Sequence, residues 1–278
     1  MKFLRIAILI PLFVMLGYFG TQAYHAAKAY ECSTAEIAQL SDASGLAQGK
    51  LDYLTSVISF GLIKDKRQAK LMQLKKEQTE HQQQSRQYLY YFLVLLAVII
   101  LFSLSCTLTG MTLVLATGSL VSLIFGLINP ILMVTIHKEI EHLGDVILSF
   151  ESKGIMGSVG KLFESGESVV ALTILLFSVI IPIVKISTLI FTLIFKQFRF
   201  AHHLVSFFKH LGKWSMVDVF VVAIFLVYLT SNQGEVSRAE IQIGLYFFLI
   251  YVILSMITTM LTQKAISPSS HLHDQKMP

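Results

Sequence analysis

The chain has 278 residues, of which 54% are hydrophobic and 14% are charged. A soluble domain of this length would carry far more charge, so the composition excludes that class and predicts an integral membrane protein. The net charge of +5 does not indicate nucleic-acid binding, because membrane proteins concentrate lysine and arginine in their cytoplasmic loops. Cys32 and Cys106 form no CxxC pair, which excludes a zinc ribbon and a redox pair.

Six apolar segments are each near the length that a helix needs to cross the hydrocarbon core of a bilayer. They cover Phe3–Phe19, Tyr88–Leu108, Thr112–Ile136, Val169–Phe195, Met216–Leu229 and Ile241–Leu261. They predict an all-α integral membrane protein with six transmembrane helices. The second and third segments nearly touch, so "SCTLTGMT" (105–112) is expected to form a tight turn between them. One unbroken helix would be about twice as long as a bilayer is thick.

The N-terminal part of the chain is expected to contain two membrane helices with an external segment between them. Residues 1–20 are interpreted as a signal anchor, and the alternative is a signal peptide cleaved at Ala27-Lys28-Ala29. A periplasmic segment follows over 21–87, and an additional transmembrane helix covers 88–110. The stretch at 64–91 is rich in helix formers and lacks glycine and proline, which predicts a helix that continues into the second span. It has no sustained heptad pattern, so a solvated stalk is favoured over a coiled coil.

Loop charge predicts the orientation. The loop 196–213 carries four basic residues and no acid, so it is expected to be cytoplasmic. The loop 137–168 carries six acidic residues against three lysines, so it is expected on the opposite side. Both termini are then cytoplasmic, including the tail 263–278. The slightly basic charge of 21–87 argues weakly against this, but long segments translocate largely regardless of charge.

Two charged residues lie within or just inside predicted spans. Lys185 is deep in the fourth span and Asp218 is near the cytoplasmic end of the fifth. An ionisable group at the centre of a bilayer costs about 2.5–3.5 kcal/mol, so a pairing or a wet cavity is expected. The two spans are antiparallel and the lysine stem can extend toward the cytoplasmic side. A Lys185–Asp218 pair, direct or through water, is therefore geometrically reasonable.

Small and polar residues form stripes on three spans. On the fourth span the stripe contains Ser178, Lys185, Thr188 and Thr192, with Pro182 one turn before the lysine. On the sixth span it contains Ser255, Thr258, Thr259 and Thr262. Gly118, Ser122 and Gly126 make a ridge on the third span that suits close helix contact, and Asn129-Pro130 breaks this helix near its outer end. The stripes either line a cavity or form a packed seam, because serine and threonine also bond back to their own helix.

Some of these residues also have simpler interpretations. Asp218 could be a first-turn carboxylate favoured by the helix dipole, and Trp214 a plain interface anchor. No hydrolase, metalloprotease or P-loop motif is present, so the chain is not expected to be an enzyme. Histidines 202, 203 and 210 lack an accompanying carboxylate or cysteine, so neither a metal site nor another cofactor is predicted. Their basic loop is better suited to contact anionic headgroups.

Four stretches resemble one known family. "GKWSMVDVFVVAIFLVYL" (212–229) resembles the most distinctive signature of the paraquat-inducible protein A family. The stretches at 126–136, 165–190 and 240–258 are similar to its Asn/Pro-containing span, its Pro/Lys-containing span and its last span. The resemblance covers the last four predicted spans, a module placed at 111–262.

The resemblance implies an inner-membrane protein of Gram-negative bacteria that moves lipids together with mammalian-cell-entry-type tunnel proteins. It also implies a tetraspanin-like four-helix module with Lys185 and Asp218 in an interior polar network, linked to proton-coupled lipid movement. Pro130, Trp214 and Ser215 fall on matched positions. The better-known members carry two modules and zinc ribbons, whereas this chain has a single module, no ribbon and about 110 extra N-terminal residues. A homodimer or an adaptor role would accommodate that difference.

Two functional hypotheses follow. In the first, the module binds and moves membrane phospholipid, possibly in a homo-oligomer or with a tunnel protein. In the second, the protein is a structural or assembly factor that grips a periplasmic partner through residues 64–88. The residues assigned to the polar network or to lipid binding are Lys185, Asp218, Asn129, Pro130, Pro182, Thr188, Trp214, Ser215, Ser255 and Thr258.

Overall fold

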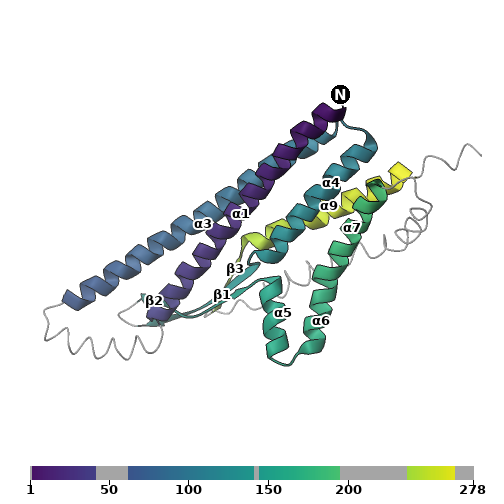
Figure 1. The fold of residues 1–278 in the computed structure, drawn as a ribbon. Coiled ribbons are helices and arrows are strands. Elements are labelled where there is room, and N and C mark those ends of the chain that lie inside the picture. Colours follow the sequence, from purple (N-terminus) through teal and green to yellow (C-terminus); the bar gives the residue numbers. More distant parts are fainter. Residues whose placement is uncertain (1, 42–61, 141–143, 195–236, 267–278) are drawn as a thin grey trace, which may run out of the picture.

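Long helices dominate the structure, a computed structural model that describes residues 2–41, 62–140, 144–194 and 237–266 (Figure 1). The helices are α1 (Lys2–Ser41), α3 (Leu62–Ser103), α4 (Leu108–Ile128), α5 (Ile155–Glu164), α6 (Ser168–Leu175), α7 (Ile181–Ile194) and α9 (Ile243–Ile266). A π-helical turn, η1 (Leu176–Ile180), joins α6 to α7. The strands are β1 (Leu132–Ile140), β2 (Gly144–Lys153) and β3 (Ser237–Ile241).

Five helical stretches among the described residues are long and apolar enough to cross a membrane. They belong to α1, α3, α4, the α6–η1–α7 helix and α9, and they correspond to five of the six predicted spans. The remaining prediction, Met216–Leu229, lies outside the described residues. The fold is thus that of a multi-pass membrane protein.

The tight turn between the second and third spans is confirmed. The α3 helix ends at Ser103, and the backbone N–H of Cys106 donates to the Ser103 carbonyl at 2.9 Å. Thr107 then caps α4, because its hydroxyl accepts the backbone N–H of Gly110 at 3.3 Å. Such capping satisfies a backbone donor that has no partner inside the helix.

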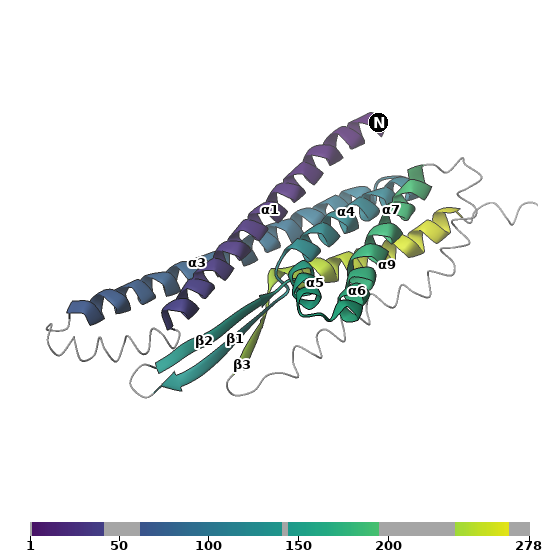
Figure 2. The same cartoon turned by 60° about the horizontal axis from the view of Figure 1, so that its bottom comes forward.

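The fold is mostly helical as expected, but it is not all-α, because a three-stranded antiparallel sheet extends from the junction of α4 and α9 (Figures 1 and 2). The strand order is β2-β1-β3, and Leu132 of β1 pairs with both Lys153 of β2 and Ile241 of β3. The third predicted span was expected to reach Ile136, but α4 ends at Ile128. Proline disfavours helical backbone in the residue before it, and Asn129 is accordingly extended, with φ −73° and ψ 151°.

The α1 and α3 helices form a long antiparallel hairpin (Figures 1 and 2). The helix predicted over 64–91 is confirmed as part of α3, which continues into the second span. Its side toward α1 is packed, since Leu74 and Ser85 are buried and the Gln78 amide donates to the Thr34 hydroxyl at 2.8 Å. The predicted stalk is therefore one helix of a hairpin, solvated on its outer face only.

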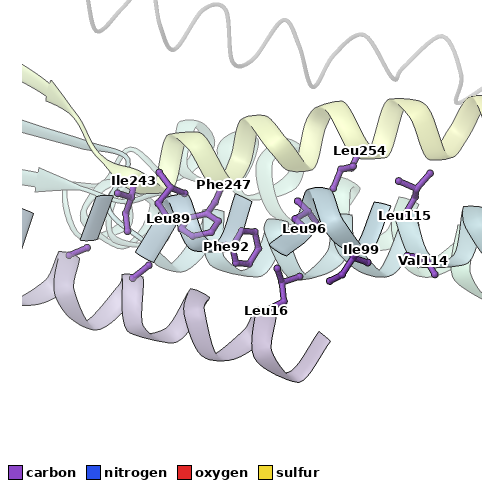
Figure 3. Close-up of a cluster of buried hydrophobic side chains, with 12 residues drawn as sticks. Leu16, Leu89, Phe92, Leu96, Ile99, Val114, Leu115, Ile243, Phe247 and Leu254 are labelled. Carbon is purple, nitrogen blue, oxygen red and sulfur yellow. The ribbon is translucent and has the colours of Figure 1, made fainter. Parts of the chain in front are cut away.

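One apolar core joins this hairpin to α4 and α9 (Figure 3). Phe92 of α3 meets Phe247 of α9 edge to face, with ring centroids 4.8 Å apart. Phe125 of α4 stands beside both rings, with centroids at 6.1 Å and 5.8 Å. Aromatic pairs in this geometry add about 0.5–1.5 kcal/mol beyond the area that they bury. The N-terminal hairpin is thus packed against the second half of the chain.

Candidate functional site

Lys185 lies in α7 and is buried, with 5% of its surface exposed. The next residue, Ile186, is fully buried in a second apolar core with Leu123 of α4 and Tyr251 of α9. This side of α7 therefore packs toward α4 and α9. The position of Lys185 inside an apolar span is thus as the sequence places it, and the expected pairing or wet cavity stays a prediction.

The backbone is irregular just before Lys185. The π-helical turn η1 contains buried Ser178, and the N–H of Ile181 donates to the carbonyl of Leu176. Pro182 follows directly, inside the continuous α6–η1–α7 helix, where its missing backbone donor leaves a carbonyl of the preceding turn without its usual helical partner. Single π-helical turns in helices are frequent at functional sites. Pro182 is itself buried, one turn from Lys185 as the sequence predicted.

The threonines of α7 bond to their own helix. Thr188 donates to the carbonyl of Val184 at 2.6 Å, and Thr192 donates to the carbonyl of Thr188 at 2.8 Å. Thr192 is buried, whereas Thr188 is only half-buried. Both hydroxyl donors are therefore already used inside the helix. This arrangement is compatible with either alternative, a packed seam or the lining of a polar cavity.

The polar stripe of α9 is buried throughout, at Ser255, Thr258, Thr259 and Thr262. The three threonines donate to carbonyls four residues earlier, at 2.7 to 2.8 Å. Within the described part of the chain, the Ser255 hydroxyl has no hydrogen-bond partner. Of the two predicted α9 residues, only Ser255 thus has an unused hydroxyl.

The small-residue ridge on α4 makes the close contact that was predicted. A methyl group on Gly126 would lie 2.9 Å from the backbone nitrogen of Phe248 in α9. A methyl group on Gly118 would lie 3.2 Å from the side chain of Leu96 in α3. Between them, the Ser122 hydroxyl is fully buried and finds no hydrogen-bond partner in the ranges that the structure describes. Two helices that pack closely, α4 and α9, thus each bury one unsatisfied serine.

Asn129 and Pro130 form the junction between α4, the sheet and α9. The Asn129 side-chain amide donates to the Phe125 carbonyl at 2.8 Å and caps α4, while its Oδ1 atom is buried without a partner. The carbonyl of Pro130 accepts the N–H of Gly244 at 2.9 Å. A methyl group on Gly244 would lie 2.6 Å from the Pro130 oxygen and 2.7 Å from the Asn129 oxygen. The observed contacts of both residues therefore hold two helix ends together.

The structure does not place the other half of the predicted network. Asp218, Trp214 and Ser215 lie outside the described residues, so the Lys185–Asp218 pair stays a prediction. The three histidines of the basic loop lie outside them as well. Within the described residues, no group of three or more histidine, cysteine, aspartate or glutamate residues could hold a metal ion.

One polar contact was not predicted. The Tyr30 hydroxyl of α1 donates to Glu240 of β3 at 2.9 Å, and the Gln82 amide of α3 lies 3.4 Å from the same hydroxyl. The Tyr30–Glu240 hydrogen bond therefore connects the N-terminal hairpin to the sheet. Tyr30 and Glu240 are 210 positions apart, so no local sequence pattern could have indicated the pair.

These features define a multi-pass helical membrane protein whose helices α4, α7 and α9 bury serine, threonine and lysine side chains. The model of the family described as Paraquat-inducible protein A matches residues 109–266, more than half of the chain. The chain belongs to the paraquat-inducible protein A family. All the candidate residues fall inside the matched region, whereas α1 and α3 lie before it.

A relative supports the same assignment. A probable intermembrane transport protein from Haemophilus influenzae is 29% identical over 114 residues. The match covers 38% of this chain and 26% of that relative, so this chain spans about a quarter of the relative's length. No solved structure matches the chain significantly.

Proposed function

We propose that this protein handles phospholipid in the bacterial inner membrane and contributes to lipid movement between membranes. The observation that carries the proposal is Lys185, a lysine with 5% of its surface exposed inside an apolar membrane helix. Such a position costs about 2.5–3.5 kcal/mol and is retained where the charge serves a substrate or proton pathway. The name of the Haemophilus relative, a probable intermembrane transport protein, supports the same class of function.

In this proposal Lys185 meets a lipid phosphate or changes its protonation state, and Asp218 sets the charge of the lysine. An ammonium group is a compact donor that binds phosphate as a point charge. The unsatisfied hydroxyls of Ser122 and Ser255 supply further donors on the two helices that pack beside α7. The proposed role is binding and transfer, with no covalent chemistry, so the protein is not an enzyme.

The finer architecture belongs to the same proposal. Residues 216–229 would supply the sixth span and complete a tetraspanin-like four-helix module with α4, the α6–η1–α7 helix and α9. Both termini would be cytoplasmic and the sheet periplasmic, following the loop charges. A homo-oligomer would replace the two-module arrangement, and a mammalian-cell-entry-type tunnel protein would receive or deliver the lipid.

Lipid retention by gently purified protein tests the proposal. Mass spectrometry would compare the wild type with Lys185→Met, Lys185→Arg and Asp218→Asn. Lys185→Met keeps the length of the side chain and removes its charge, so it should lose an enriched phospholipid at least about tenfold, and Lys185→Arg should keep part of it. Leu189→Ala is the matched control, because Leu189 is equally buried on α7 but apolar. It should lower stability and leave the lipid profile unchanged.

The proposal fails if folded Lys185→Met retains the same lipids as the wild type. The polar residues would then serve packing, and the second hypothesis, a structural or assembly factor, would take precedence. The observation that favours this alternative is the outer face of α3, where Lys75, Lys76 and Arg86 are exposed along the hairpin.

The hairpin changes how the alternative is tested. Deleting 64–88 would uncover the side of α1 that packs on Leu74 and Ser85, so it would test folding as much as partner binding. Charge reversal of Lys75, Lys76 and Arg86 to glutamate leaves the buried face intact. It should abolish resistance to envelope stress only if the hairpin binds an acidic partner, and it should leave retained lipid unchanged.

A further inference from the structure

The short helix α5 lies between the sheet and the α6–η1–α7 span and has two different faces. Val159 is buried, whereas Met156 and Phe163 are 51% and 45% exposed. Met156 and Phe163 are seven positions apart, so they stand on the same face of the helix. At about 100° per residue, Lys161 projects from nearly the opposite side. Val159 lies about 40–60° around the helix from these two positions, so the two large apolar side chains border the face by which α5 contacts the protein, and Lys161 lies on the other side.

The start of α5 is fixed at the level where the membrane helices α4 and α9 end. A methyl group on Gly154, the residue that caps α5, would lie 3.4 Å from the backbone oxygen of Asn129 at the end of α4. Gly244, at the start of α9, meets the same oxygen. From this level α5 runs across the direction of α9 instead of along it (Figures 1 and 2).

The other end of α5 leads directly into a membrane span. Gly166 has a φ of 85°, a left-handed conformation that glycine adopts freely, and it turns the chain into α6. The span Ser168–Ile194 begins two residues later, and its first apolar side chain, Val169, is 80% exposed. Phe163 and Val169 are thus exposed apolar side chains on either side of a short polar turn, residues 164–168, that leads into a helix long and apolar enough to cross a membrane.

We propose that α5 is an interfacial helix that lies in the leaflet on the side of the sheet, with Met156 and Phe163 inserted among the upper acyl chains. Both ends of α5 are at the level where spans begin or end, so its apolar face borders the headgroup region. Interfacial helices of this kind bury their apolar face about 5–10 Å into the headgroup and acyl boundary. Lys161 then lies on the headgroup side, where its charge suits lipid phosphate.

Lipid is favoured over a second copy of the chain or another protein as the surroundings of Met156 and Phe163. The reason is that the adjoining span, Ser168–Ile194, itself requires a bilayer. The exposed Val169 requires an apolar surrounding medium three residues after the Gly166 turn, and a bilayer supplies one to Phe163 as well. An interfacial position of α5 would also affect where the sheet lies. The same Gly154–Asn129 contact that starts α5 also holds the end of α4, so α5 would fix the height of the sheet above the membrane.

Depth measurements on the full chain in phospholipid vesicles test the proposal. Single cysteines replace Met156 or Phe163 in a Cys32→Ser, Cys106→Ser background and carry the fluorophore NBD. Lys161→Cys is the matched control, since it is exposed on the same helix but on the other face. Phospholipids with a spin label high on the acyl chain should quench the two apolar positions at least about twofold more than position 161. Aqueous iodide should show the reverse order.

Two results would overturn the proposal. Equal quenching at the three positions by iodide, with little by the spin-labelled lipid, would mean that α5 stands in water. Protection of positions 156 and 163 from both quenchers would mean that protein covers them. If the protection disappeared as the protein-to-lipid ratio fell, the cover would be a second copy of this chain. Neither result depends on whether the protein moves lipid.

Discussion

Two buried serines, Ser122 and Ser255, have hydroxyl groups without a hydrogen-bond partner among the residues that the structure describes. A buried polar group that is left unsatisfied costs about 1–3 kcal/mol. In a helix bundle that only needed close packing, alanine would fill these positions without that cost. Their presence on α4 and α9, the helices that pack beside the buried Lys185, is consistent with a bound polar group that they contact.

Replacing Ser122 by alanine should therefore raise the stability of lipid-free protein by about 1 kcal/mol, because an unsatisfied hydroxyl is removed. Thermal unfolding in detergent would measure the change. Ser119→Ala is the matched control, because Ser119 is equally buried on α4 but its hydroxyl donates to the Ala116 carbonyl at 3.0 Å. The control should be neutral or destabilising. Destabilisation by Ser122→Ala would show that the serine has a partner within the protein.

At the scale of elements, the link between the hairpin and the sheet depends on few polar contacts. Tyr30 of α1 reaches Glu240 of β3, and β3 is a strand of five residues. Because β3 is short, contacts at its two ends contribute much of what keeps it paired with β1. Just after β3, the backbone N–H groups of Gln242 and Gly244 donate to the carbonyls of Ile131 and Pro130. Tyr30 contacts Glu240, two residues before Gln242.

Tyr30→Phe should loosen β3 locally. The loss of one hydrogen bond to a charged group costs about 1.5–3 kcal/mol, and less here because Glu240 is exposed and regains water. Hydrogen exchange in β3 should rise several-fold, while exchange in α9 stays unchanged. Tyr24→Phe on the same helix is the control. Unchanged exchange in β3 would mean that the β1 pairing alone holds the strand.

The helices of this protein could be predicted from its sequence, but the sheet could not. Apolar runs of membrane-spanning length define α9 and the start of α4 within a few residues, but they place the end of α4 too late. The first residues of β1, 132–136, are nearly as apolar as the helix before them, so hydropathy alone extended the span to Ile136. Only Asn129-Pro130 marked the change of backbone. The buried lysine followed from its place in an apolar run. The Gly244 contact and the Tyr30–Glu240 pair join distant segments, which no local pattern indicates.

At the scale of the whole molecule, the N-terminal hairpin and the family region are one folded unit. The hairpin lies before the matched residues 109–266, yet Phe92 and Leu96 of α3 share a core with Val114 and Phe247. On the α1 side, Gly20 lies against the ring of Phe125, and a methyl group at Gly20 would overlap it. That ring is held between Phe92 and Phe247, so it has little room to move aside.

The chain should therefore reassemble when it is cut in the turn between α3 and α4. Fragments 1–105 and 106–278, expressed together as separate chains, should co-purify through the α3–α4 and α3–α9 contacts. Gly20→Ala should weaken the complex by about 1–3 kcal/mol, because it overpacks the contact with Phe125. Gly17→Ala is the matched control, since nothing lies within 4 Å of a methyl group there. Alanine at that position should be neutral or slightly stabilising. Equal recovery of both variants, or no association of the unmodified fragments, would show that the hairpin is a separate appendage whose partner is not the family region.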